Sequence, residues 1–121
     1  MSHPLFRPEA LSGQNTLGLP CQATKVLQLA NESDLAVLHQ AGIDLSSCSI
    51  LGSGSNVILP PVLEQPVIQV RIMGGGDPRL TPDAVLIEAS AGESWHGLVT
   101  HTVMNGWGGL ENLALIPGTV G

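Results

Sequence analysis

A short loop of small residues between two apolar runs is the part of the sequence best suited to chemistry. The loop consists of Gly52, Ser53, Gly54, Ser55 and Asn56. Glycines allow the positive φ angles that turn successive backbone N–H groups toward a single anion. The loop contains no Lys or Arg, so the backbone amides would have to hold the negative charge. We therefore predict a cradle for the diphosphate of a dinucleotide cofactor, with an ordinary turn between two strands as the alternative.

The spacing of this loop differs from that of the common helix-based phosphate loops. Val57 stands where the G-x-G-x-x-G fingerprint needs its third glycine, and a strand-like run to Leu59, ended by two prolines, follows in place of a helix. No Gly-Lys-Ser/Thr closes the loop. Neither Ser53 nor Ser55 has glycines at both positions that a nucleophile elbow requires. The pattern thus disfavours Rossmann, Walker and serine hydrolase sites.

The other reactive side chains form no pattern that indicates catalysis or metal binding. His96 and His101 are five residues apart, so one helical face would not present both, and there is no C-x-x-C or H-E-x-x-H. No spacing brings together the candidate acids Glu88, Glu93 and Glu111. We interpret the acids as solvated or helix-terminal, with general acid–base chemistry as the alternative, and we predict no metal site.

Composition and charge restrict the class of protein. The 121 residues suit a single domain, and ten acidic against four basic residues give a net charge of −6. This charge opposes binding to nucleic acid or to an anionic membrane surface. No apolar run reaches the roughly twenty residues of a membrane span. Cys21 and Cys48 lie far apart without a C-x-x-C pairing, so we expect buried thiols and a cytoplasmic location.

The elements that must hold the glycine loop begin with a strand–helix–strand unit. Residues 1–20 contain several prolines and glycines, which predict an extended arm with turns. A strand over 25–30, a helix over 33–41 that ends at Gly42, and a strand over 49–51 follow. A right-handed crossover would make the two strands parallel. The glycine loop would then leave the second strand directly.

The second half changes from a crossover to a meander. The pattern predicts a half-buried, alternating strand over 66–72, a turn or loose loop over 74–78, and an antiparallel strand over 84–89. From Glu93 the apolar period becomes helical, and Asn105-Gly106 should end this helix. Its apolar face would contain Trp95, Leu98, Val99, Thr102 and Val103. These elements together predict a mixed α+β fold.

Four segments in order carry a resemblance to a known family. They are Asn15-Thr16-Leu17-Gly18, Leu51-Gly52-Ser53-Gly54-Ser55-Asn56-Val57, Ala91-Gly92-Glu93-Ser94-Trp95-His96-Gly97-Leu98-Val99 and Gly109-Leu110-Glu111-Asn112-Leu113-Ala114-Leu115-Ile116-Pro117-Gly118-Thr119-Val120-Gly121. Together they resemble the bacterial UDP-N-acetylenolpyruvoylglucosamine reductases, also called UDP-N-acetylmuramate dehydrogenases. Leu17 stands where that family usually has an aromatic residue, a departure that touches only packing.

The resemblance implies an α+β FAD-binding domain of the vanillyl-alcohol-oxidase (PCMH) type. Residues 1–20 would be an N-terminal arm, 21–64 a first, small strand–helix–strand lobe, and 65–121 the start of a mixed, sheet-rich second lobe. The second lobe would be incomplete and the C-terminal substrate-binding domain absent. The chain would therefore be an N-terminal fragment of the reductase.

The resemblance also implies which residues bind the cofactor. Around the FAD diphosphate it places Gly52, Ser53, Gly54, Ser55 and Asn56, and at the start of a second flavin-contacting loop it places Pro117, Gly118, Thr119, Val120 and Gly121. The catalytic residues of the family have no matching position in this sequence, so no catalytic residue is expected here.

The activity that the resemblance implies is an NADPH-dependent reduction in peptidoglycan precursor synthesis. NADPH would reduce FAD, and the reduced flavin would deliver hydride to UDP-N-acetylglucosamine enolpyruvate to give UDP-N-acetylmuramate. The complete enzyme would be a cytoplasmic monomer that binds neither nucleic acid nor membrane, whereas the fragment alone would be inactive. The alternative is a stand-alone module that binds FAD or another nucleotide without catalysis.

Overall fold

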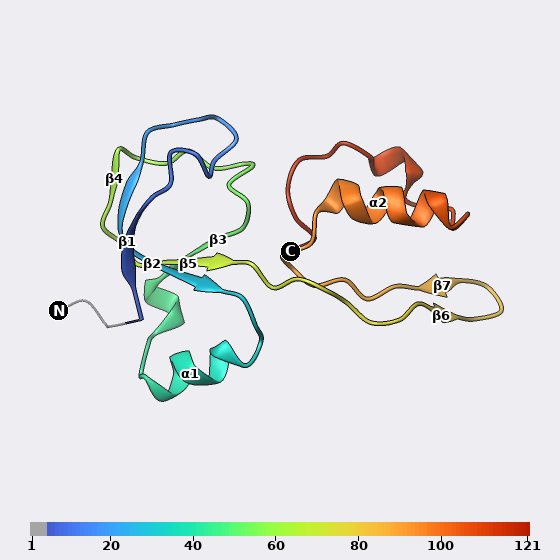
Figure 1. Ribbon diagram of the computed structural model, residues 1–121, viewed down its shortest axis with the longest axis horizontal. Helices are drawn as coiled ribbons and strands as arrows, with labels where there is room; N and C mark the ends of the chain where they lie inside the picture. The colour runs from blue at the N-terminus through green and yellow to red at the C-terminus, as the bar shows by residue number, and fades with distance from the viewer. Residues whose placement is uncertain (1–4) are drawn as a thin grey trace.

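A computed structural model describes residues 5–121, and the first four residues of the predicted arm lie outside the described part. The chain forms two parts that lie side by side (Figure 1). The first part is a sheet with the helix α1, and the second contains a long hairpin and the helix α2. The C-terminus returns to the centre, next to the sheet (Figure 1).

A five-stranded sheet organises the first part. Its strands are β1 (Arg7–Ala10), β2 (Gln22–Leu29), β3 (Ser49–Leu51), β4 (Val62–Leu63) and β5 (Val67–Val70). They are ordered β1-β2-β5-β3, with β4 pairing to β2; β1 is antiparallel to β2, and the other pairs are parallel. The predicted parallel strand–helix–strand unit is confirmed, although β5 inserts between its two strands.

The central strand β5 differs from the half-buried strand that the sequence predicts. Val67, Ile68 and Gln69 are buried in succession, so burial does not alternate. The reason is topological, because β2 and β3 flank β5 and apolar side chains cover both of its faces. The strand also belongs to the first sheet, which therefore extends across the expected boundary between residues 64 and 65.

The helix α1 (Asp34–Gln40) connects β2 to β3 by way of the short 3-10 helix η1 (Leu45–Ser47). It ends at Gly42 as predicted: Gly42 has φ +70°, its N–H donates to His39 O at 3.0 Å, and Ile43 N–H donates to Leu38 O at 3.1 Å. These bonds form a Schellman motif, which needs a left-handed residue after the helix. Leu38 is the buried residue of α1, whereas Leu35 is 43% exposed.

Two expectations for the first part are wrong. The predicted arm contains β1, which pairs with β2 from Arg7 to Ala10. Its backbone finds ladder partners there, which local propensity did not reveal. The run from Val57 to Leu59 is irregular and forms no strand: Val57 and Leu59 pack their side chains against the first core cluster, and two prolines end the run.

The hairpin of the second part consists of β6 (Arg79–Leu80) and β7 (Val85–Leu86). Of the two alternatives for residues 74–78, the loose loop agrees with the structure and the turn does not, because the chain reverses over 81–84. The predicted pairing of 84–89 with 66–72 is wrong, since β7 pairs with β6. A Cβ at Gly75 would lie 2.1 Å from Glu88 O. The glycines therefore allow two extended segments to approach each other, and they do not form the turn.

The helix α2 (Trp95–Met104) matches the predicted helical period and its end. Ser94 is the N-cap, and its Oγ accepts from Gly97 N–H at 3.1 Å. Val99 and Thr102 of the predicted face are buried, but Val103 is 52% exposed. The 3-10 helix η2 (Glu111–Leu113) then packs beside α2.

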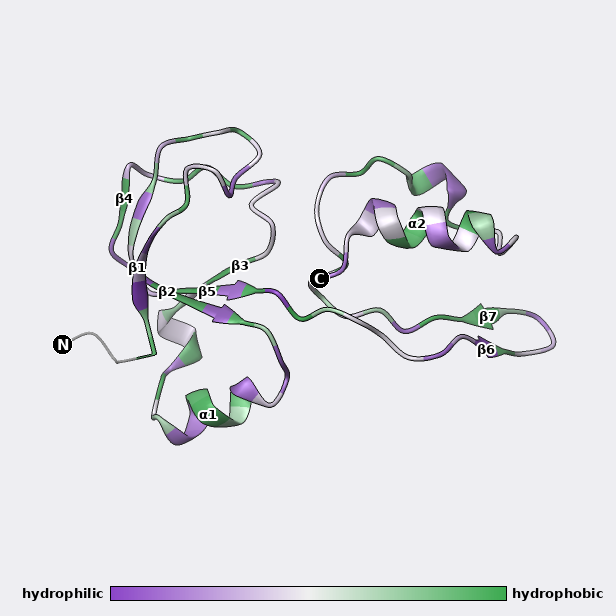
Figure 2. Ribbon diagram, in the orientation of Figure 1, coloured by the Kyte–Doolittle hydropathy of each residue, from purple (hydrophilic) through white to green (hydrophobic). Residues whose placement is uncertain are grey.

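The core is concentrated in the first part. Two apolar clusters contain the buried residues of the sheet and α1, one around Val67 and the other around Ile68. Among residues 5–121, Val99 is the only buried apolar residue that follows Ile68. Figure 2 shows hydrophobic residues on α1 and on β7 alike, yet β7 has no buried residue. The second part thus leaves apolar surface uncovered. No helix within residues 5–121 has the length and apolar character to span a membrane.

The free energy of unfolding should depend on Leu38 far more than on Leu35 of the same helix. Leu38→Ala removes a side chain that is 2% exposed and should lower the free energy of unfolding by about 2–5 kcal/mol. Leu35→Ala, at a surface position, should change it by no more than about 0.5 kcal/mol. Urea denaturation of both variants gives the two values. Equal losses would contradict the placement of α1.

Candidate functional site

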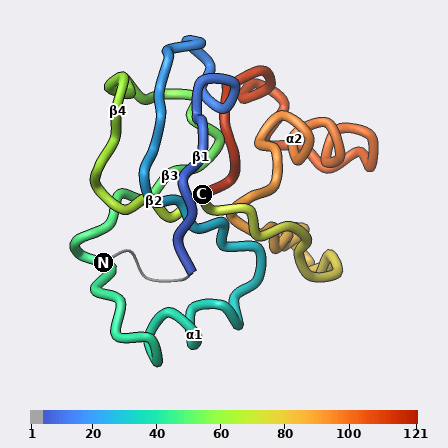
Figure 3. The backbone as a smooth tube through the Cα atoms, turned by 60° about the vertical axis from the view of Figure 1, so that its left-hand side comes forward, coloured from blue at the N-terminus to red at the C-terminus, as the bar shows by residue number. Residues whose placement is uncertain are grey.

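The two segments that were predicted to bind a cofactor lie around one cleft. The cleft has a volume of about 230 Å³ and is lined by Ile50, Leu51, Gly52, Ser53, Gly54, Ser55, Asn56, Val57, Pro117, Gly118, Thr119 and Gly121. Figure 3 shows the C-terminal segment running beside the loop that follows β3. The fold thus brings together two segments that are far apart in the sequence.

Glycines set the distance between the two walls of the cleft. A Cβ at Gly52 would lie 3.2 Å from Thr119 Oγ1, and a Cβ at Gly118 would lie 2.9 Å from Ser55 Oγ. Gly118 also has φ +117°, which side-chain-bearing residues rarely adopt. Larger residues at these two positions would push the walls apart or fill the space between them.

Gly54 rests on the turn that connects β1 to β2. It has φ +71°, and a Cβ there would lie 2.3 Å from Gln14 O and 2.9 Å from Asn15 Cα. On the other side of the contact, Thr16 N–H donates to Gly54 O at 3.0 Å. Both the left-handed backbone and the close approach therefore require glycine at this position.

The turn itself is made rigid by Asn15, which is buried. Its Nδ2 donates to Leu11 O at 2.9 Å and to Leu19 O at 3.0 Å, and its Oδ1 accepts from Leu19 N–H at 2.8 Å. One side chain thus closes the turn from three sides. The segment Asn15–Gly18, which belongs to the predicted arm with turns, therefore also supports the glycine loop.

The second wall of the cleft is held by the segment that begins α2. Trp95 N–H donates to Gly118 O at 3.1 Å, Val120 N–H to Glu93 O at 2.9 Å, and Gly121 N–H to Ala91 O at 3.0 Å. These bonds form a short antiparallel pairing. Of the ten predicted residues, nine line the cleft and Val120 does not.

Several donors around the cleft have no acceptor within residues 5–121. The N–H groups of residues 52–56, and those of Gly118 and Thr119, donate to no described residue. The side chains of Ser53, Ser55 and Asn56 also make no hydrogen bond within this part of the chain. Buried backbone donors are almost always satisfied, and Gly54 is buried. The cleft therefore calls for a solvent or ligand acceptor.

The chemistry of this donor set fits a diphosphate. Its N–H and hydroxyl groups can bond to phosphate oxygens, and the residues that line the cleft include no acidic side chain to repel them. They also include no Lys or Arg, so the binding would rest on dipoles. A volume of about 230 Å³ is below the range of about 300–1,000 Å³ for sites that enclose a whole small molecule. The cleft can hold the diphosphate, and the rest of a dinucleotide would extend beyond it.

Two of the three candidate acids, Glu93 and Glu111, accept hydrogen bonds from backbone N–H groups outside the cleft. Glu93 Oε1 accepts from Gly74 N–H at 2.6 Å. Hydrogen bonds from the N–H groups of Glu111 itself and of Gly109 hold the pKa of the exposed Glu111 below its ordinary value. No group of three or more His, Cys, Asp or Glu residues that could hold a metal ion occurs within residues 5–121. None of these acids lines the cleft.

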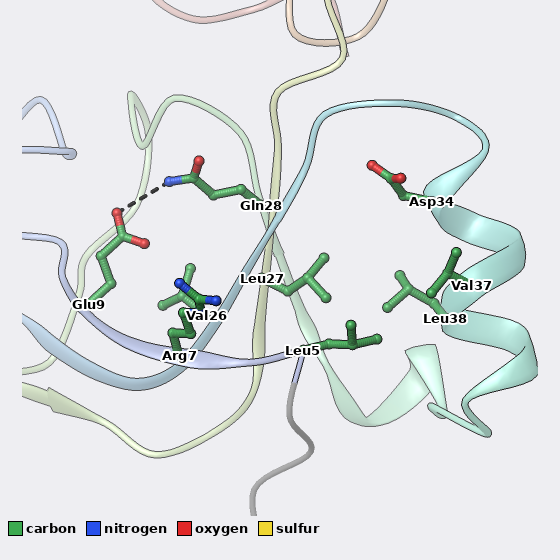
Figure 4. A pocket seen from close by; sticks show the side chains of 9 residues that line it. All are labelled: Leu5, Arg7, Glu9, Val26, Leu27, Gln28, Asp34, Val37 and Leu38. Carbon is green, nitrogen blue, oxygen red and sulfur yellow. Dashed lines mark hydrogen bonds between the residues drawn. The ribbon is translucent and has the colours of Figure 1, made fainter.

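Sequence reasoning missed the supporting residues and part of the lining. Ile50, Leu51 and Val57 contribute to the cleft because they enter and leave the glycine loop. Gln14 was not singled out, although its carbonyl oxygen touches Gly54. The positions of glycine and asparagine indicated a turn, but no local signal shows which loop will pack against it. A larger cavity of about 470 Å³, between β1, β2 and α1 (Figure 4), contains none of the predicted residues.

The chain is similar in sequence to curated UDP-N-acetylenolpyruvoylglucosamine reductases. It is 49% identical to the one from Bordetella pertussis over 88% of this chain and 30% of that protein. It is 44% identical to the one from Psychrobacter arcticus over 92% of this chain and 31% of that protein, and 42% identical to the one from Chromobacterium violaceum over 96% and 35%. The chain thus spans about a third of the length of these relatives. No family model matches the chain.

One solved structure resembles the fold. It is the crystal structure of UDP-N-acetylenolpyruvylglucosamine reductase from Thermus caldophilus, with a TM-score of 0.68 and 22% identity. The match covers 96% of this chain and 40% of that one. At this level of identity the likeness concerns the fold.

The packing of Gly54 on Gln14 can be separated from the effect of its positive φ by a matched variant. Gly18 has φ +63° with open space around it, so Gly18→Ala should lower the free energy of unfolding by about 1–2 kcal/mol. Gly54→Ala should lower it by a further amount on the order of 1–3 kcal/mol, because the new Cβ overlaps a backbone oxygen. Urea denaturation compares the two variants, and a Gly54→Ala protein as stable as Gly18→Ala would exclude the close contact.

Proposed function

Because the chain belongs to the UDP-N-acetylenolpyruvoylglucosamine reductase family, we propose that it forms the FAD-binding part of an NADPH-dependent reductase. The family uses FAD as its cofactor and NADPH as its reductant. The reaction of the intact protein would convert UDP-N-acetylglucosamine enolpyruvate to UDP-N-acetylmuramate for peptidoglycan synthesis. The observation that carries the proposal is the cleft between residues 52–56 and 117–121, with its row of unpaired N–H donors.

In this proposal the glycine loop holds the diphosphate of FAD. The N–H groups of residues 52–56 bond to its oxygens, with Gly118 and Thr119 opposite them. Ser53, Ser55 and Asn56 add side-chain donors that are otherwise unpaired. The bound flavin supplies the hydride chemistry, while this chain orients it. The acids that could move a proton lie outside the cleft, so we assign no catalytic residue to residues 5–121.

We propose that the second part of this chain is an incomplete lobe that other polypeptide completes. Leu80 is 75% exposed, Met104 82% and Leu115 77%. Apolar groups of this size normally lie in a core. The relatives are about three times as long as their match to this chain, so they have polypeptide that could cover such a surface. The substrate-binding residues would also come from there, and the fragment alone would be inactive.

A stand-alone module that binds FAD or another nucleotide without catalysis is the second candidate. It is favoured by the observation that both walls of the cleft come from residues 50–121. The first part also has its own core of two clusters. For either function we propose a cytoplasmic monomer, in keeping with the free Cys21 and Cys48, and no nucleic-acid partner.

Reductase activity can be tested by completing the chain. A chimera would join residues 1–121 to the part of the Bordetella pertussis reductase that the match leaves uncovered. We expect the chimera to retain FAD through desalting and to oxidise NADPH only when UDP-N-acetylglucosamine enolpyruvate is present. The 121-residue chain should oxidise no NADPH. A yellow 121-residue protein that oxidises NADPH would contradict the fragment assignment, whereas a chimera that is folded but colourless would contradict the FAD site.

The diphosphate cradle can be tested in the same chimera. Gly54→Val should abolish FAD retention because the side chain displaces the loop from its support, and Asn56→Asp should do so because a carboxylate repels the diphosphate. Asn112→Asp is the control, since it adds the same charge in η2, away from the cleft. The ratio of flavin to protein absorbance measures retention. Normal FAD content in either cleft variant would refute the cradle.

A further inference from the structure

A chain of hydrogen bonds between side chains links the edge of the sheet to its centre. Gln14 Nε2 donates to Glu9 Oε1 at 2.6 Å, and Gln14 Oε1 accepts from Gln69 Nε2 at 2.8 Å and from Arg71 Nη2 at 3.1 Å. Gln28 Nε2 joins at the Glu9 end at 3.3 Å (Figure 4). Gln14 is therefore held by residues of β1, β5 and the segment that follows β5.

The charged ends fix the orientation of every amide in this network. An ionised Glu9 can only accept and Arg71 can only donate, so Gln14 must present its NH₂ to Glu9 and its oxygen to Arg71. Gln69 must then present its NH₂ to Gln14. This explains why Gln69 Oε1, on a fully buried side chain, has no partner within residues 5–121. A buried acceptor without a hydrogen bond lowers the free energy of unfolding. Here it results from the orientation that Glu9 and Arg71 impose on the amides.

The same residue that the network holds is the support of the glycine loop. The backbone oxygen of Gln14 is the atom that a Cβ at Gly54 would approach to 2.3 Å. Two residues along the chain, Thr16 N–H bonds to Gly54 O. Any shift of Gln14 is therefore passed to Gly54 through direct contact, at the middle of the row of unpaired N–H groups.

We propose that Gln14 is a positioning residue, which sets the place of Gly54 and thereby the affinity of the cradle for a dinucleotide diphosphate. The inference rests on the proposed function, but it assigns a role to residues outside the cleft. Glu9, Gln69 and Arg71 act through Gln14: they fix its side chain, and its main chain then fixes the loop. A displacement of about 1 Å is enough to spoil a preorganised set of donors.

The fixed donor and acceptor directions of the network can be tested by exchanging the carboxylate and the amide between positions 9 and 14. Gln14→Glu keeps the acceptor toward Gln69 and Arg71, but it puts a second carboxylate against Glu9. Adding Glu9→Gln restores a donor at that contact, because the new amide can donate to the carboxylate introduced at position 14. Gln65→Glu is the control for added charge, since the Gln65 amide reaches only Ser47 O, at 3.3 Å, within the described residues. If the network positions the loop, the second change rescues the first.

Two measurements separate the positioning role from the proposed function. Hydrogen exchange of the 121-residue chain should become faster in Gln14→Glu at Thr16, whose N–H donates to Gly54 O, and at Gly18, whose N–H donates to Asn15 O. It should remain unchanged in α1 and return toward wild type in the double variant. In the chimera, Gln14→Glu should weaken FAD binding about tenfold or more, and Glu9→Gln/Gln14→Glu should recover most of that loss. Gln65→Glu should change neither readout.

Each outcome decides the proposal. Unchanged exchange at Thr16, the amide that bonds to Gly54 O, in Gln14→Glu, or a double variant as impaired as the single one, would overturn the positioning role. If the wild-type chimera binds no FAD while exchange follows the predicted pattern, the proposed function fails and the network still positions the loop. If FAD affinity is unaffected while exchange changes, Gln14 holds the loop without setting the affinity, and the proposal is wrong.

Discussion

The contact between Gly54 and the backbone of Gln14 is the constraint on which the candidate site depends. Gly54, with φ +71°, lies directly on the carbonyl oxygen of Gln14. The N–H of Thr16 in turn donates to the carbonyl oxygen of Gly54. Two loops that leave different strands are thereby locked to each other. The C-terminal segment can then approach at Gly52 and Gly118, where side chains would obstruct it. The shape of the cleft follows from these contacts, and no charged side chain lines it.

In the proposed function, this arrangement would bind an anion in an acidic chain with few cations. Helix-based phosphate loops use the dipole of a helix N-terminus, but here the loop follows the short strand β3 and is succeeded by irregular chain. Donors come instead from a run of backbone amides and from three uncharged side chains, Ser53, Ser55 and Asn56. Dipoles of this kind bind well only when they are held in place. This requirement gives a physical reason for the dense hydrogen bonding of Asn15 and Gln14 behind the loop.

Local patterns predicted the elements whose signals are contained in short stretches. The helix ends at Gly42 and Asn105-Gly106 depend on neighbouring residues and are confirmed. The sequence did not predict the continuous burial of β5 through Gln69, the pairing of β1 with β2 or the pairing of β7 with β6. Each of these depends on what packs against the segment. The resemblance indicated both walls of the cleft. The contact of Gln14 with Gly54 is visible only in the structure. A glycine in the sequence indicates which backbone angles are permitted, but it does not indicate which segment will pack against it.

The central claim is that the amides of the glycine loop bind the diphosphate of FAD, and backbone NMR tests it most directly. FAD would be added to the ¹⁵N-labelled 121-residue chain, and the amide shifts followed residue by residue. The account predicts the largest changes at residues 52–56, Gly118 and Thr119, with little change at the other glycine run, residues 74–76. Changes centred on β1 and α1, or no change at residues 52–56, would contradict it.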